Sequence, residues 1–175
     1  MRHYVNNLIM VTIQALILSK KQFGDGHLML SILSREKGFL KVSAFGGQRL
    51  SKRFNGKLDY FQVLELEIQP STKEGLVYYN LCSANTVLHT FCDIPKNIKK
   101  FFAGTYVLEL PGLILTEAED YFDLVYEYLD KINKLDDTAA LNRILVEYTL
   151  LTYRKAGFVC DNYNIADNKL FFRKD

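Results

Sequence analysis

Short apolar runs, each bounded by turn-forming residues, fill the first half of the chain. The clearest of them alternates strictly, with Leu64, Leu66 and Ile68 on one face of an extended segment and glutamates on the other. The runs that we expect to form strands are 12–19, 27–33, 39–45, 60–69 and 76–83. The fourth run is expected to be broken at Pro70. Five short strands with glycine- or proline-containing connections and little helix predict a small closed β-barrel.

The third run separates two faces by the parity of its residues. Inward positions are expected to be Leu40, Val42 and Ala44, and outward positions Phe39, Lys41, Ser43 and Phe45. Rings interleaved with a lysine on the outside of a barrel supply the base stacking and phosphate contact that single-stranded nucleic acid requires. The alternative is that the two phenylalanines pack beneath loops or against the second half of the chain.

From about residue 84 the apolar spacing changes to a helical period. We expect a helix over 97–110 closed by Pro111 and Gly112, and a second helix opened by a capping box at 116–119. The next apolar stripes are Phe122, Val125, Leu129 and Ile132, and then Leu141, Ile144, Leu145, Tyr148 and Leu151. Residues 160–175 are expected to form a terminal strand or a docked tail. The predicted fold class is α+β, with a barrel domain over 1–83 and an all-α helical domain over 84–175.

Charge is distributed unevenly along a chain whose net charge is only +2 over 175 residues. Residues 20–57 carry nine Lys/Arg and two Asp/Glu, a net charge of +7, whereas residues 109–137 carry two Lys and nine Asp/Glu, a net charge of −7. Such asymmetry favours two different functional faces. The alternative is solvated surface of either sign, which for the acidic region is the simpler interpretation.

The segment 46–57 is a glycine-bracketed loop with four basic residues and no acidic one. Its cations are Arg49, Lys52, Arg53 and Lys57. A loop of this composition contributes little to a core, so its charges face water or a polyanion. A cationic loop on a small β scaffold therefore predicts contact with a phosphate backbone.

Catalytic and metal-binding motifs are missing from the sequence. Cys82, Cys92 and Cys160 form no Cys-x-x-Cys pair and no metal-ligand spacing, which excludes a zinc finger and is typical of a reducing cytoplasm. The histidines are scattered, and the glycine-containing segments match neither a P-loop nor a dinucleotide-binding turn. The N-terminal apolar run is interrupted by polar residues and predicts no membrane span. We therefore expect a cytoplasmic protein that is not an enzyme and has no cofactor.

The ordered series of motifs resembles the family of the bacterial recombination mediator RecO. The segments that carry the resemblance are 13–19, 22–28, 34–42, the Gly46-Gly47-Gln48-Arg49 loop, 58–61, 106–110 and 121–124. They extend over most of residues 12–158, although no single one of them is diagnostic. The chain departs from many members of the family in two ways. Cys160 stands alone where they carry a four-cysteine zinc module, and the chain ends at residue 175.

The resemblance implies an N-terminal OB-fold, a helical C-terminal domain and no catalytic residues. It further implies binding of single- and double-stranded DNA and annealing of complementary strands. The implied partners are a RecR-like protein, the acidic C-terminal tail of single-stranded-DNA-binding protein and, indirectly, the RecA recombinase.

The residues expected to contact DNA phosphates are Arg35, Lys37, Lys41, Arg49, Lys52, Arg53 and Lys57, with Phe39 and Phe45 as candidates for base stacking. A pocket for an acidic, aromatic-ended partner peptide is sought in the helical domain, either near Arg143 or where Lys99 and Lys100 flank two phenylalanines. The alternatives in other functional classes are an OB-fold protein–protein adaptor and an RNA-binding protein without a repair role.

Overall fold

The computed structural model describes residues 9–47, 54, 57–73, 76–114, 121–158, 163–166 and 169–172. The chain divides into two compact units, which are treated separately below. The barrel unit comprises Met1–Thr90 with Glu117–Phe122, and the helical unit comprises Phe91–Thr116 with Asp123–Asp175.

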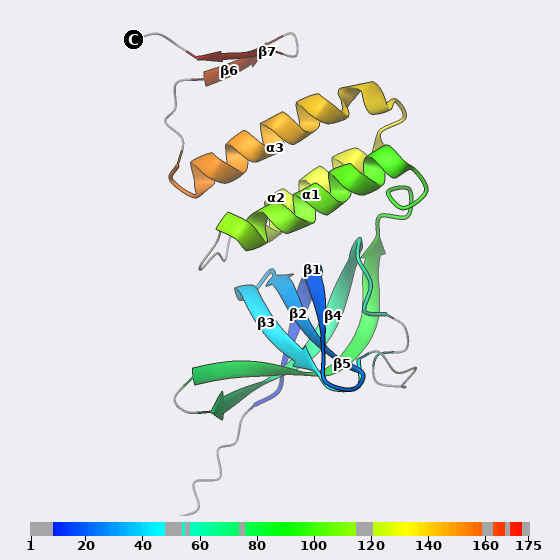
Figure 1. Ribbon diagram of the computed structural model, residues 1–175, viewed down its shortest axis with the longest axis vertical. Helices are drawn as coiled ribbons and strands as arrows, with labels where there is room; N and C mark the ends of the chain where they lie inside the picture. The colour runs from blue at the N-terminus through cyan, green and yellow to red at the C-terminus, as the bar shows by residue number, and fades with distance from the viewer. Residues whose placement is uncertain are drawn as a thin grey trace, which may run out of the picture. The chain divides into compact units, whose positions relative to one another are not determined.

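Five strands close the barrel unit into a barrel (Figure 1). They are β1 (Val11–Phe23), β2 (His27–Ser34), β3 (Gly38–Ala44), β4 (Gln62–Lys73) and β5 (Leu76–Thr90). The order around the barrel is β1-β2-β3-β5-β4, and β3 pairs with β5 in parallel while the other neighbours are antiparallel. A five-stranded barrel followed by helices confirms the predicted α+β fold with an N-terminal OB-fold.

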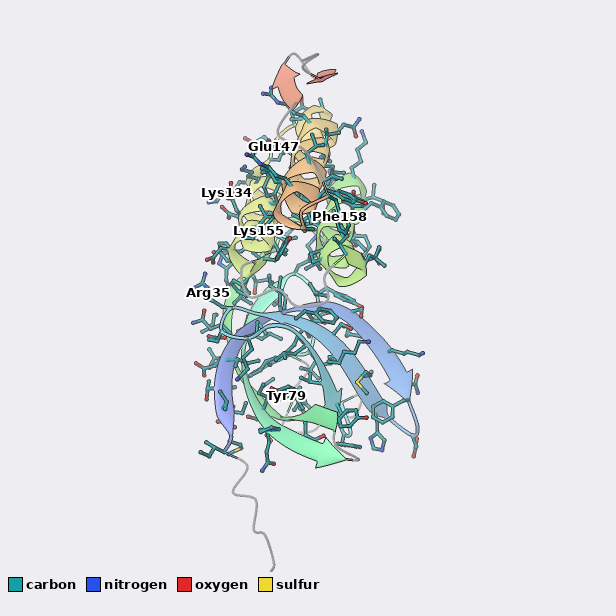
Figure 2. The ribbon with its side chains drawn as sticks, turned by 90° about the vertical axis from the view of Figure 1, so that its left-hand side faces the viewer. Arg35, Tyr79, Lys134, Glu147, Lys155 and Phe158 are labelled. Carbon is teal, nitrogen blue, oxygen red and sulfur yellow. The ribbon has the colours of Figure 1, made fainter. Side chains whose placement is uncertain are left out.

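The inward positions of the strands form one apolar core. Leu64, Leu66 and Ile68 are fully buried in it, as their alternation predicted, and so are Val42 and Ala44 of β3. On the opposite parity of β3, Lys41 and Phe45 are exposed. The predicted separation of β3 into an inward and an outward face is therefore confirmed. Figure 2 shows Tyr79 inside the ring of strands, where it packs against the same core.

Three strands, β1, β4 and β5, run further than the sequence predicted, and β1 continues to Phe23 instead of ending at residue 19. The expectation that Pro70 breaks β4 is wrong, because β4 continues to Lys73 with Pro70 opposite Tyr79 of β5. In the described residues β4 pairs with β1 only as far as Ile68, so Pro70 has a partner strand on one side only. The N–H that proline lacks is therefore not needed for a hydrogen bond to β1. Strand β5 continues to Thr90, so the expected change of period at residue 84 and the expected division at 83/84 fall inside a strand.

The first helix of the helical unit, α1 (Ile98–Ile114), passes through Pro111, so the expectation that this proline closes the helix is wrong. Proline has no N–H to donate to the carbonyl four residues earlier, which here belongs to Val107. The buried hydroxyl of Tyr148 donates a 2.7 Å hydrogen bond to that carbonyl. The side chain of another helix therefore supplies the hydrogen bond that the proline cannot make.

The other helices follow their predicted apolar stripes. They are α2 (Tyr121–Lys134) and α3 (Leu141–Lys155), preceded by a short 3-10 turn, η1 (Thr138–Ala140). The α2 stripe is buried throughout, and in α3 Leu141 and Tyr148 are buried. After α3, Gly157 adopts a left-handed backbone and Phe158 donates its N–H to the Tyr153 carbonyl, which is a common way to end a helix.

The remaining described segments are two short strands, β6 (Tyr163–Ala166) and β7 (Lys169–Phe172), which pair antiparallel with each other. For residues 160–175 the sequence left a terminal strand or a docked tail as alternatives, and the described segments are strands. The predicted capping box at 116–119 lies outside the described residues. Within the described residues, none of the helices has the length and apolar character of a membrane span.

Candidate nucleic-acid interface

The turn between β2 and β3 presents Arg35 and Lys37 at its exposed tip. The Ser34 hydroxyl accepts hydrogen bonds from the N–H groups of Glu36 and Lys37, at 3.1 and 3.2 Å, and donates to the Glu36 carboxylate at 2.8 Å. Gly38 completes the turn with φ +66°, which suits glycine. Ser34 itself is fully buried, so the turn is fixed to the barrel and its two cations project from a defined backbone.

The same turn is tied to β1 by its acidic residue. The Glu36 carboxylate accepts from the Gln14 N–H at 3.0–3.1 Å. The Arg35 guanidinium lies 3.4 Å from the Gln14 side-chain oxygen and 4.8 Å from the centroid of the Phe122 ring, a residue of the same unit. Figure 2 shows Arg35 at the margin of the barrel. Arg35 is thus partly committed to contacts within the protein, whereas the Lys37 side chain forms no ion pair with a described residue.

Lys41 lies midway along β3 on the outward face. It is exposed, and it stands opposite Ser31 of β2, which in turn stands opposite Ser19 of β1. The next row toward the β1–β2 turn consists of Lys21, Met29 and Ser43. Residues directly opposite one another share a face, so Lys21 and Lys41 belong to one outward surface of β1, β2 and β3, which we call the outer face.

The end of the outer face at the β1–β2 turn is aromatic. Phe45 meets His27 and Phe23 edge-to-face, with ring centroids 5.3 and 6.0 Å apart, and Phe23 lies 5.5 Å from His27. Phe45 is 50% exposed, whereas Phe39, at the other end of β3, is half-buried. The two predicted stacking residues therefore lie in different surroundings and near opposite ends of the strand.

Lys57 is engaged by the barrel itself. Its ammonium donates to the backbone carbonyls of Asn85 and, at 3.4 Å, of Ala84 in β5. The other loop cations of the prediction, Arg49, Lys52 and Arg53, lie outside the described residues. The predicted phosphate contacts of all four stay predictions.

The structure brings some of the predicted residues together and separates others. Lys41 and Phe45 share the outer face, whereas Arg35 and Lys37 lie at the far end of β3. Six residues separate Lys37 from Ala44, the last residue of β3, which at about 3.3 Å per residue is more than 20 Å. A nucleic acid that contacted both ends would therefore have to run along β3 rather than bind at one point.

Sequence reasoning missed three residues of the outer face, Lys21, Phe23 and His27. Their only signal was their position on either side of the Gly24-Asp25-Gly26 turn. Because Phe23 pairs with His27 and Lys21 with Met29, a hairpin register counted outward from this turn places all three on one face.

The electrostatics of the barrel distinguish paired from unpaired cations. Lys20 donates to Asp59 at 3.1 Å and lies 4.3 Å from the centroid of the Tyr60 ring. No ion pair links the side chains of Lys21, Lys37 or Lys41 to another described residue. The Ser83 hydroxyl of β5 donates to the Glu67 carboxylate of β4 at 2.6 Å. This hydroxyl and the Asn85 side chain hold the pKa of Glu67 below its usual 4.5. The outer face therefore keeps positive charge that the barrel does not neutralise.

Barrel topology and the helices that follow it define the class: an OB-fold protein with a helical part. Residues 8–86 match the family model described as "Recombination protein O N terminal". This part of the chain is similar to the RecO family, and the resemblance drawn from the motifs is confirmed.

Similar proteins are named as DNA repair proteins. A DNA repair protein RecO of Rhodopirellula baltica is 20% identical over 143 residues, which cover 82% of this chain and 52% of that protein. One of Nitratidesulfovibrio vulgaris is 40% identical over 65 residues, 37% of this chain and 26% of that protein. One of an Anaeromyxobacter species is 24% identical over 144 residues, 82% of this chain and 55% of that protein. The chain spans about half the length, or less, of these relatives.

Proposed function

We propose that this protein is a noncatalytic DNA-binding recombination mediator that acts in DNA repair in the bacterial cytoplasm. Similarity to the RecO family supports a role in DNA repair and recombination. Binding of single- and double-stranded DNA, strand annealing and recombinase loading are the finer parts of the proposal.

The observation that carries the proposal is the unneutralised positive charge on the outer face. Lys21 and Lys41 project from adjacent parts of a rigid sheet, and neither is ion-paired to a described residue. The strand 2–3 face is where OB-folds bind oligonucleotides. Lysines there would contact phosphates without reading sequence and would release counterions.

Annealing follows from the same electrostatics. Two complementary strands repel each other through their phosphates, and cations between them reduce that repulsion. We assign this role to Arg35, Lys37 and Lys41 on the barrel and to Arg49, Lys52, Arg53 and Lys57 of the loop. The ammonium of Lys57 already bonds to carbonyls of β5, which restricts its movement.

Partner binding is proposed for the helical unit. An acidic, aromatic-ended tail, such as that of single-stranded-DNA-binding protein, requires apolar surface beside a cation. The Lys100 ammonium donates to the Asn133 carbonyl at 2.9 Å and is buried, so it is a structural group. Lys99 is exposed next to Ile98 and Phe102, both 66% exposed, and makes the better candidate than Lys100. Arg143 is also exposed. Contacts with a RecR-like protein and indirect loading of RecA belong to the same proposal.

The rival functions are a protein–protein adaptor and an RNA-binding protein, because OB-folds serve many functions. Salt-dependent retention of DNA separates the proposal from the adaptor. Competition between single-stranded DNA and RNA of equal length separates it from the RNA-binding protein.

The test is charge reversal in the loop. Arg49, Lys52, Arg53 and Lys57 are replaced together by glutamate, and the matched control reverses four exposed cations of the helical unit: Lys99, Arg143, Arg154 and Lys155. Both variants change the net charge equally. The loop variant should lose binding to a fluorescent oligonucleotide at low salt and lose annealing of complementary strands, with an unchanged circular dichroism spectrum. Equal affinity in the loop variant and the wild type would refute the placement.

A further inference from the structure

Three aromatic rings cluster at the end of the outer face next to the β1–β2 turn, and the cluster is partly open to solvent. Phe23, His27 and Phe45 form a closed triangle in which every ring contacts the other two, with centroids 5.3–6.0 Å apart. Buried rings commonly associate in this way, yet here half of Phe45 is open to solvent. We call these three residues the aromatic triad.

The backbone holds the triad in place. Phe23 and His27 are the last pair of the β1–β2 ladder, so their side chains lie on the same face of the sheet, next to the turn. The Gly46 N–H donates to His27 Nδ1 at 2.9 Å. This bond requires Nδ1 to be the unprotonated nitrogen and fixes the plane of the imidazole. Gly46 adopts φ +74°, which favours glycine, and it connects Phe45 directly to the basic loop. The rings are therefore oriented before any ligand binds.

Two lysines share the outer face with the triad. Lys21 is two residues before Phe23 on the same face of β1, and Lys41 precedes Phe45 by four residues on the same face of β3. Both are exposed and neither is ion-paired to a described residue. Opposing this, Asp25 in the turn adds one exposed negative charge. Flat aromatic rings on the same face as two lysines match a ligand that has flat bases joined by anionic links.

We propose that the aromatic triad is a stacking platform for an unpaired nucleobase, so that the barrel unit binds single-stranded nucleic acid more tightly than duplex. The proposal rests on the proposed function, and it adds that the protein recognises the base as well as the phosphates. Bases inside a duplex are already stacked on their neighbours and cannot lie on Phe45, whereas a single strand exposes both faces of each base. Phosphate contacts alone would not favour the single strand, because a duplex has the higher charge density.

The chain contains no tryptophan, which provides a direct readout. F45W introduces one indole into the triad, and F102W introduces one at a position on α1 that is 66% exposed and lies outside the barrel unit. Titration with an oligothymidylate should quench the tryptophan fluorescence of F45W, because a base stacked on the indole quenches it, and should leave that of F102W unchanged.

Affinity supplies the second arm. F45L keeps an apolar side chain and removes the ring, and F102L is its control. F45L should bind a single-stranded oligonucleotide about 5- to 150-fold more weakly than the wild type, the range expected for loss of one stacked base. Its affinity for a duplex of the same length should change less than about twofold. With wild-type protein, replacing bases of the oligonucleotide by abasic residues should weaken binding to a similar degree, since the phosphates remain.

The outcomes separate this proposal from the one on which it rests. A wild-type protein that binds neither DNA nor RNA refutes both. Nucleic-acid binding that F45L and abasic residues leave unchanged, or that F45L weakens equally for single strands and duplexes, refutes the platform and leaves the proposed function standing. Loss of a protein partner in F45L, with nucleic-acid binding intact, would show that the triad is a docking site for a peptide and would also overturn the platform.

Discussion

Removing the Tyr148 hydroxyl tests whether its hydrogen bond to Val107 is what allows α1 to continue past Pro111. The Tyr148 hydroxyl donates to the Val107 carbonyl at 2.7 Å, and Tyr148 and Val107 are both fully buried. Tyr148→Phe deletes the donor and leaves the ring in place. Because Pro111 has no N–H, the carbonyl then has no donor within α1.

The expected cost comes from an unsatisfied buried acceptor rather than from lost packing. Leaving such a group without a partner costs about 1–3 kcal/mol, more than the roughly 1 kcal/mol of an average hydrogen bond. For a chain of this size, 1 kcal/mol corresponds to a shift of about 2–4 °C in Tm. Tyr148→Phe should therefore lower Tm by about 2–12 °C.

A double-mutant cycle isolates the cause. Pro111→Ala restores an N–H that can donate to Val107, so Tyr148→Phe should cost about 1 kcal/mol less in that background than in the wild type. Urea unfolding followed at 222 nm, where the helices dominate the signal, measures both costs. An equal cost in the two backgrounds, or a cost below about 0.5 kcal/mol in the wild type, would refute the explanation.

Two further predictions concern the barrel. Ser83→Ala should raise the pKa of Glu67 toward 4.5, because the Ser83 hydroxyl is the largest cause of its depression; carboxyl chemical shifts followed by NMR against pH measure this, and an unchanged pKa would contradict it. A depressed carboxyl pKa stabilises the fold above the unfolded-state pKa, so this contribution is present above about pH 4.5 and is lost as the pH falls through the folded-state value. Lys57→Met should lower the urea midpoint, since the Asn85 and Ala84 carbonyls lose their donor, and should weaken DNA binding less than Lys41→Met does; the reverse order of DNA affinities would show that Lys57 serves the ligand.

The sequence predicted the barrel because alternation is a local signal. Leu64, Leu66 and Ile68 needed only their own spacing to be assigned to the core, and they are buried there. The two prolines show where local signals fail. Pro70 is tolerated because that part of β4 has one neighbouring strand in the described residues, and Pro111 because a tyrosine from α3 contacts the carbonyl it leaves free. Neither circumstance is visible from the residues next to a proline.

The candidate site divides in the same way. Parity alone placed Lys41 and Phe45 on the outer face, and both are exposed there. Phe23 and His27 were missed because their meeting with Phe45 depends on the register across two turns. Lys57 was assigned to the ligand because nothing in its neighbourhood shows that carbonyls of β5, almost thirty residues later, lie within its reach.

The salt dependence of single-strand binding tests the central claim most directly. The wild type and a Lys21→Gln/Lys41→Gln variant are titrated with a fluorescent oligonucleotide at several salt concentrations. If the outer face holds the phosphates, log affinity falls linearly with log salt, and the variant's slope is smaller by about 1.4, or roughly 0.7 for each lost contact to a single strand. A wild-type affinity that does not depend on salt, or the same slope in both proteins, would contradict the assignment of this face to nucleic acid.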